Sequence, residues 1–133
     1  MTMLRIALPN KGRLAEETRE LFNDAGLEVR ARSERALTAS LGGVFEGVFV
    51  RAQDIPELVA DGAADVGVTG WDLINESGRD LQSLADLEFG RCRLAVAASE
   101  DSRISSISDL EAGCRVAKSF PRLGSKFFAG GVL

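Results

Sequence analysis

Residues 4–14, LRIALPNKGRL, decide how the fold begins. The apolar run 4–8 stops at Pro9-Asn10, and apolar residues recur at helical spacing after Lys11, Gly12 and Arg13. This order predicts a strand, a cationic turn and a helix. Helix N-termini favour anions, and glycine lets backbone approach one closely. We interpret the turn as a candidate phosphate site; a basic helix start on the surface is the alternative.

Strand-like and helix-like segments alternate along the rest of the chain, which is typical of an α/β fold with a mostly parallel sheet. Gly42-Gly43 predicts a hairpin turn, and Asp54 is expected to cap a helix. The expected strands are 4–8, 27–31, 36–41, 44–50, 64–69, 92–98 and 115–118, and the expected helices are 14–25, 54–61, 71–77, 107–111 and 123–128.

Two further charged positions follow expected strands, where α/β sheets bind ligands. Arg51 ends a strand just before a helix, and pairing with Asp54 is its alternative role. Gly70 and Asp72 lie where another strand turns into a helix, so Asp72 either holds a ligand group or caps the helix. By spacing alone, Arg35 belongs to an ordinary charged loop.

Composition excludes several classes of protein. The 133 residues are 45% hydrophobic, so the chain can bury a core, and the formal net charge of −4 argues against general nucleic-acid binding. The chain has no histidine, which excludes histidine-based catalysis and histidine-ligated metals. No membrane-spanning run or secretory signal is visible. We expect Cys92 and Cys114 to be small core residues of a reduced, cytoplasmic protein, with no metal site.

The order of five motifs is more specific than any one of them. The motifs are KGRL at 11–14, RAQDIP at 51–56, DVGVTGWDL at 65–73, FGRCRL at 89–94 and VAKSFP at 116–121. Together they resemble ATP phosphoribosyltransferase, from about residue 3 to about residue 129.

The resemblance implies a two-lobe α/β architecture like that of type II periplasmic binding proteins. Residues 1–92 would form a nucleotide- and phosphate-binding lobe one, and residues 93–133 would begin lobe two, with the active site between the lobes. The family transfers a phosphoribosyl group from phosphoribosyl pyrophosphate to N1 of ATP, with Mg²⁺ accompanying the substrates, in the first step of histidine biosynthesis. The implied partners are ATP, phosphoribosyl pyrophosphate, a regulatory subunit and further copies of the chain, without nucleic acid or membrane.

The resemblance also assigns roles to particular residues. Arg13 and Arg35 would be catalytic. Substrate would be bound by Lys11, Gly12, Arg51, Gly70 and Asp72, with the cations on phosphates and the aspartate positioning the nucleotide.

The sequence departs from the family pattern after residue 94. No stretch there matches the family's Thr-Gly-x-Thr-Leu-like phosphoribosyl pyrophosphate loop, and the strand that completes lobe one is missing. The final residues 130–133 supply no completing element. We therefore expect a truncated chain, or one that depends on a partner, with little or no activity alone. A non-catalytic nucleotide- or anion-binding module and a regulatory subunit of the same fold are the alternatives.

Overall fold

The computed structural model describes residues 3–129. The chain divides into two compact units, residues 1–91 and residues 92–133. Residues 130–133, where the sequence predicts no further element, lie outside the described residues.

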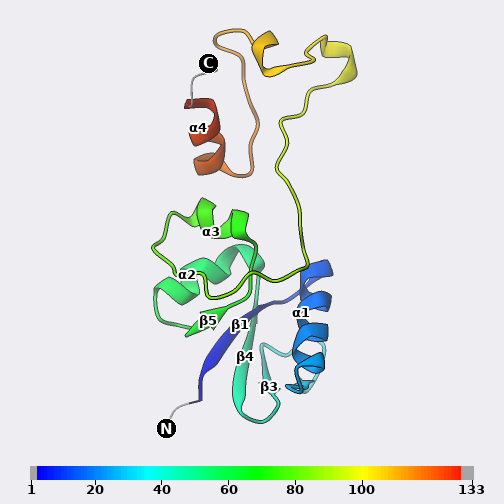
Figure 1. The fold of residues 1–133 in the computed structure, drawn as a ribbon, viewed down its shortest axis with the longest axis vertical. Helices are drawn as coiled ribbons and strands as arrows, with labels where there is room; N and C mark the ends of the chain where they lie inside the picture. Colours follow the sequence, from blue (N-terminus) through cyan, green and yellow to red (C-terminus); the bar gives the residue numbers. More distant parts are fainter. Residues whose placement is uncertain (1–2, 130–133) are drawn as a thin grey trace. The chain divides into compact units, whose positions relative to one another are not determined.

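The first unit is built on a five-stranded sheet in the order β2-β3-β4-β1-β5 (Figure 1). Its strands are β1 (Arg5–Pro9), β2 (Val29–Arg30), β3 (Thr38–Leu41), β4 (Phe45–Val50) and β5 (Val66–Gly67). β1 pairs in parallel with β4 and β5, whereas β2-β3-β4 is antiparallel. The sheet is therefore mixed rather than mostly parallel. Gly42 and Gly43, with φ of 61° and 74°, form the expected hairpin turn, which makes β3 and β4 antiparallel.

Helices cover both faces of this sheet. α1 (Gly12–Asp24) packs Phe22 against Ile6 and Leu8 of β1. α2 (Ile55–Ala60) packs against Ala7, which points to the opposite face because side chains alternate along a strand. The observed fold is thus helix, sheet and helix in three layers, with β1 between β4 and β5 and covered on both faces.

The helix boundaries agree with the glycine signals but not with the cap expected at Asp54. A short 3-10 turn, η1 (Ala52–Asp54), precedes α2, and Asp54 makes no capping hydrogen bond. Its φ of −90° and ψ of −15° are helical, whereas a capping side chain starts from extended backbone. α3 (Trp71–Ser77) ends at Gly78, where φ is 66°.

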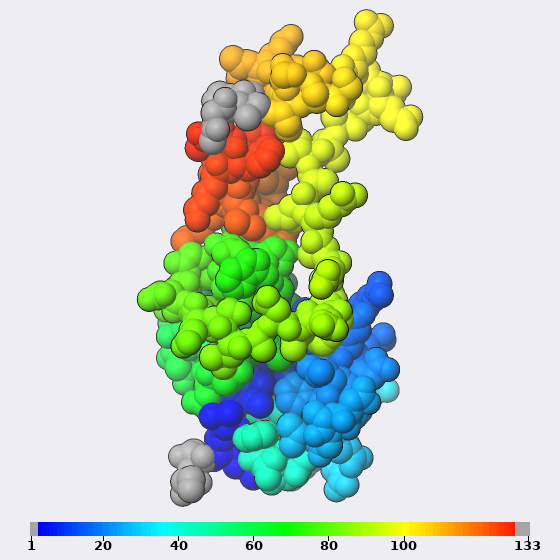
Figure 2. All heavy atoms as spheres, in the orientation of Figure 1, coloured from blue at the N-terminus to red at the C-terminus, as the bar shows by residue number. Residues whose placement is uncertain are grey.

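The second unit has much less regular structure. Its described residues, 92–129, contain two 3-10 turns, η2 (Glu100–Ser102) and η3 (Ile107–Asp109), and one helix, α4 (Pro121–Ala129). The strands predicted at 92–98 and 115–118 do not form, and no residue of 92–129 is buried. In the space-filling view, the yellow-green part of this unit forms a narrow chain of atoms (Figure 2).

Two side-chain expectations for this unit are also wrong. Cys92 and Cys114, expected in a core, are exposed. Leu94 and Val96 are 52% and 49% exposed. A strand needs hydrogen-bonded neighbours and an apolar layer beneath it, and the described residues of this unit supply neither. Among the helices within residues 3–129, none is long and apolar enough to cross a bilayer.

The contact between β5 and α2 generates a stability prediction. A Cβ atom at Gly67 would clash with Ile55 Cγ2 and lie 3.0 Å from Val59 Cγ2. We expect Gly67→Ala to lower the free energy of unfolding by about 1–3 kcal/mol, measured by chemical denaturation, because the packed layer must shift. In an Ile55→Ala background, Gly67→Ala should lower the free energy of unfolding by a smaller amount, because the clashing Ile55 Cγ2 atom is absent. Equal costs in both backgrounds would contradict this account.

The turn at η3 generates a pH prediction. The Asp109 carboxylate accepts hydrogen bonds from the backbone N–H groups of Ser105 (2.9 Å) and Ser106 (3.0 Å), which lower the pKa of Asp109. Because the pKa of Asp109 is lower in the folded turn, the ionised carboxylate stabilises the turn at pH values above the ordinary aspartate pKa. This stabilisation is lost as the pH falls through the folded-state pKa. We expect the protection factor of the Ser106 amide, which is the intrinsic exchange rate divided by the observed one, to fall over that acid range, with Asp109→Asn abolishing this pH dependence. Identical profiles for the two chains would refute it.

Candidate functional site

The carboxyl ends of the parallel strands lie along one edge of the sheet, here called the carboxyl edge. Pro9 of β1 is opposite Val50 of β4, and Ala7 of β1 is opposite Gly67 of β5. Lys11 follows β1 as the N-cap residue of α1, so the predicted turn is the start of this helix, with Gly12 and Arg13 as its first residues. Arg51 follows β4, and the segment 68–72 follows β5. Side chains that the sequence places after three separate strands are therefore brought to one edge.

Arg35 belongs to the same edge for a different reason. β3 runs antiparallel to β4, so β3 begins where β4 ends. Leu37, just before β3, accepts a 2.9 Å hydrogen bond from the Phe49 N–H. The loop that carries Arg35 therefore reaches the carboxyl edge, which spacing alone did not reveal.

Most of the cations at this edge have no protein partner. Among residues 3–129, the side chains of Lys11, Arg35 and Arg51 form no hydrogen bond or ion pair, and all three are exposed. The alternative pairing of Arg51 with Asp54 is not formed. Unpaired guanidinium and ammonium groups leave all their donors available to an anion.

Arg13 is held from one side only. Its Nε donates a 2.9 Å hydrogen bond to Glu17 Oε1, one turn along α1, while the side chain stays 88% exposed. No described residue engages its two Nη groups, which are the pair that binds a phosphate in the bidentate way. Sequence reasoning missed Glu17, although its i, i+4 spacing from Arg13 was visible.

The turn before α3 shows why Gly70 and Asp72 occur together. Gly70 is the N-cap position and Asp72 is the second helical residue, so Asp72 is not the helix cap. Asp72 Oδ1 accepts a 2.9 Å hydrogen bond from the Leu73 N–H. A Cβ atom at Gly70 would clash with this oxygen. The glycine therefore makes room for the folded-back carboxylate.

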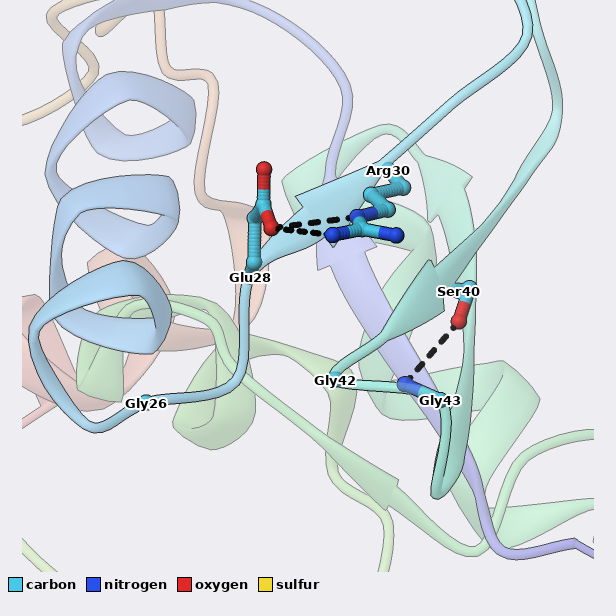
Figure 3. A pocket seen from close by; sticks show the side chains of 6 residues that line it. All are labelled: Gly26, Glu28, Arg30, Ser40, Gly42 and Gly43. Atoms are coloured by element: carbon cyan, nitrogen blue, oxygen red, sulfur yellow. Dashed lines mark hydrogen bonds and ion pairs between the residues drawn. The ribbon is translucent and has the colours of Figure 1, made fainter.

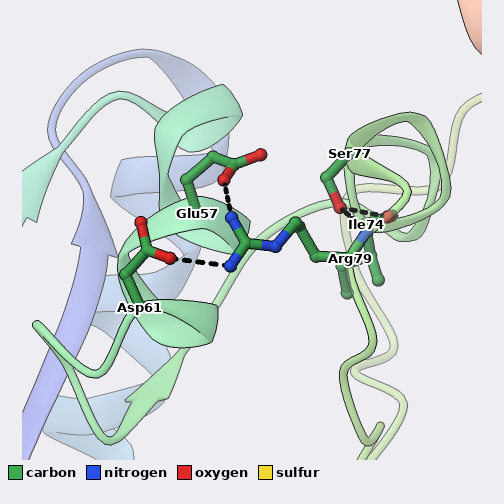
Figure 4. A network of polar contacts seen from close by, with 5 residues as sticks. All are labelled: Glu57, Asp61, Ile74, Ser77 and Arg79. Carbon is green, nitrogen blue, oxygen red and sulfur yellow. Dashed lines mark hydrogen bonds and ion pairs between the residues drawn. The ribbon is translucent and has the colours of Figure 1, made fainter.

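A network that sequence reasoning missed fixes the far end of α3. Arg79 donates hydrogen bonds to Glu57 and to Asp61 (2.7 Å), both at α2 (Figure 4). The hydrogen bond and charge of Asp61, followed by those of Glu57, raise the pKa of the Arg79 guanidinium. Ser77 Oγ accepts from the Arg79 backbone N–H at 3.2 Å. The chain leaving α3 is thus tied to α2.

A pocket lies at the opposite edge of the sheet from the predicted residues (Figure 3). It is lined by Gly26, Glu28, Arg30, Ser40, Gly42 and Gly43. Its arginine already pairs with Glu28 at 2.8 Å, so the charge is neutralised within the protein. This pocket therefore lacks the free cations that characterise the carboxyl edge.

Metal ligands are sparse in the described structure. Within residues 3–129, no group of three or more Cys, Asp or Glu side chains is placed to hold a metal ion, and the chain has no His.

Comparison with known proteins gives the same family along most of the chain. The sequence profile of ATP phosphoribosyltransferase matches residues 51–131. The chain is 69% identical over 129 residues to an ATP phosphoribosyltransferase of Gemmatimonas aurantiaca and 50% identical over 127 residues to that of Methanococcoides burtonii. Each alignment covers 95% of this chain but 44% of the relative, so the chain spans less than half the length of these relatives.

A solved structure is also similar. The ATP phosphoribosyl transferase (HisG:HisZ) complex from Thermotoga maritima aligns with a TM-score of 0.56 at 26% identity, covering 65% of this chain and 41% of that one. The chain therefore belongs to the ATP phosphoribosyltransferase family of histidine biosynthesis.

Proposed function

We propose that the carboxyl edge of the first unit binds the phosphates of ATP and of phosphoribosyl pyrophosphate, as part of a protein that transfers the phosphoribosyl group to N1 of ATP. One observation carries the proposal: Lys11, Arg13, Arg35 and Arg51 converge on this edge with donors free for an anion. The family membership supplies the reaction.

The proposed chemistry needs charge stabilisation more than a protein nucleophile. N1 of adenine attacks C1 of the ribose, and the bond from C1 to the pyrophosphate oxygen breaks with its electron pair leaving on pyrophosphate. Negative charge grows on the leaving group, where arginine guanidinium groups stabilise it. Arg13 and Arg35 serve this catalytic role in the proposal, while Lys11, Gly12 and Arg51 bind phosphate. A chain without histidine can perform such a reaction.

Asp72 and Gly70 would position the nucleotide. The Asp72 carboxylate uses Oδ1 within the protein, and no described residue pairs with Oδ2. An unpaired carboxylate oxygen can accept hydrogen bonds from a hydroxyl or amino group of ATP. Gly70 supports this role by leaving the carboxylate its space.

Magnesium enters this proposal with the substrates. The described residues offer no cage of acidic side chains, and Mg²⁺ typically binds through substrate phosphates, few carboxylates and water. The ion would neutralise phosphate charge beside the same arginines.

The architecture and assembly follow from the family in this proposal. We propose that the first unit corresponds to lobe one, and the second unit to the beginning of lobe two, of an architecture like that of type II periplasmic binding proteins. A cytoplasmic location, self-association and a regulatory subunit belong to the same proposal. The Thermotoga structure, described as a complex, is the observation that favours the subunit.

Two arginine substitutions test the site. Arg13→Ala and Arg51→Ala should each weaken ATP binding by the 133-residue chain roughly 10- to 100-fold in calorimetric titration, the cost of losing a hydrogen bond to a charged group. Arg30→Ala is the matched control, since Arg30 lies at the opposite edge and pairs with Glu28. Wild-type affinity in both site variants would remove these residues from the site.

The missing loop gives a second prediction. We expect the 133-residue chain to bind ATP without turnover, because no sequence after residue 94 resembles the loop that holds phosphoribosyl pyrophosphate. The assay is pyrophosphate release with ATP, phosphoribosyl pyrophosphate and Mg²⁺, with the full-length Gemmatimonas relative as the positive control. Steady turnover by the short chain would contradict this expectation. Binding without turnover is also how a non-catalytic nucleotide module would behave.

A further inference from the structure

The hydroxyl of Thr69 joins two loops of the carboxyl edge. Thr69 Oγ1 donates a 2.7 Å hydrogen bond to the carbonyl oxygen of Ala52, seventeen residues away, in a partly buried position. Ala52 directly follows Arg51, and Thr69 precedes Gly70 and Asp72. The bond therefore lies between the cation after β4 and the carboxylate after β5.

Strand pairing does not join these two loops directly. β4 and β5 are not neighbours, since β1 lies between them. Two strand spacings separate them, which is about 10 Å. Within residues 3–129, no backbone hydrogen bond joins 51–54 to 68–70, where the Val68 N–H donates instead to Ala7. The connection over the end of β1 therefore comes from the Thr69 side chain.

Each loop is also closed by a hydrogen bond of its own. The Asp54 N–H donates to the Arg51 carbonyl at 2.9 Å, which closes the turn at η1. The Ile74 N–H donates to the Gly70 carbonyl at 3.1 Å, which starts α3. The packing of α2 on β5 and the Arg79 network hold the bodies of these elements together, and the Thr69 hydrogen bond fixes the two turns at their tips, next to Arg51 and Asp72.

We infer that Thr69 is a positioning residue: its hydroxyl holds Arg51 and Asp72 at the separation that lets one nucleotide contact both, the phosphates at the arginine and the nucleoside at the carboxylate. This inference rests on the proposed function, since it assumes that ATP occupies the carboxyl edge. Thr69 touches no substrate in this scheme and acts through its two neighbours.

Two ligands separate positioning from general stability. ATP must reach both Arg51 and Asp72, whereas inorganic tripolyphosphate has no nucleoside and uses only the cations. Thr69→Val keeps the β-branched shape but removes the donor, and Thr69→Ser keeps the donor. We expect Thr69→Val to weaken ATP binding about three- to tenfold, the value of one net hydrogen bond, and to leave tripolyphosphate binding unchanged. Thr69→Ser should bind ATP like the unmodified chain.

Thr18 provides the matched control. Its hydroxyl donates a 2.6 Å hydrogen bond to the Leu14 carbonyl, and the residue is 1% exposed within α1. Thr18→Val therefore removes a buried bond of the same kind without joining site loops. It should lower the denaturation midpoint and leave ATP affinity unchanged. If Thr69→Val did not fold, Thr69→Ala would take its place, since alanine removes the hydroxyl without adding a methyl group at its position.

The outcomes are distinguishable from failure of the proposed function. If Arg51→Ala weakens ATP binding while Thr69→Val binds ATP normally, the positioning role is overturned and the proposed site survives. An equal loss of affinity for ATP and for tripolyphosphate in Thr69→Val would also overturn the positioning role. So would a loss of ATP affinity in Thr69→Ser as large as that in Thr69→Val. If the unmodified chain does not bind ATP, both proposals fall together.

Discussion

The burial of β1 on both of its faces is the constraint on which the first unit depends. Ile6 and Leu8 pack beneath α1, while Ala7 packs beneath α2. A strand covered on both sides must pair on both edges, because water cannot satisfy its backbone groups. β4 and β5 provide that pairing in the parallel direction, as parallel sheets with helices on their faces require. Parallel pairing then aligns the strand ends, and the strand ends carry the polar residues.

This alignment explains how an acidic chain can gather an anion site. The whole chain carries a net charge of −4, yet Lys11, Arg35 and Arg51 meet at one edge without carboxylate partners among the described residues. Two arginines elsewhere are paired within the protein, Arg30 with Glu28 and Arg79 with Glu57 and Asp61. Local charge therefore results from which cations remain unpaired, and total charge says little about ligands of this size.

The sequence predicts structure well where the cause is local. The helix after Gly12 and the hairpin at Gly42-Gly43 follow from short-range spacing and positive φ, and both form. The strands expected at 92–98 and 115–118 had the right composition but required partners that spacing cannot supply, and they do not form. The cap expected at Asp54 failed because the preceding residues form a 3-10 turn. The placement of Arg35 follows from the antiparallel pairing of β3 with β4, which the predicted hairpin implied but the spacing around Arg35 itself does not contain.

The motif at residues 65–73 shows how a sequence signature can arise from geometry. The Asp65 carboxylate accepts the backbone N–H that begins β1, at 2.8 Å. Gly67 lets α2 lie against β5, and Thr69 bonds the turn after β4. Gly70 leaves space for the carboxylate of Asp72. Each of the five residues therefore meets a different steric or hydrogen-bonding requirement, and Asp72 also keeps one carboxylate oxygen without a partner among the described residues. Most residues of this motif therefore hold the backbone in the conformation from which the Asp72 side chain acts.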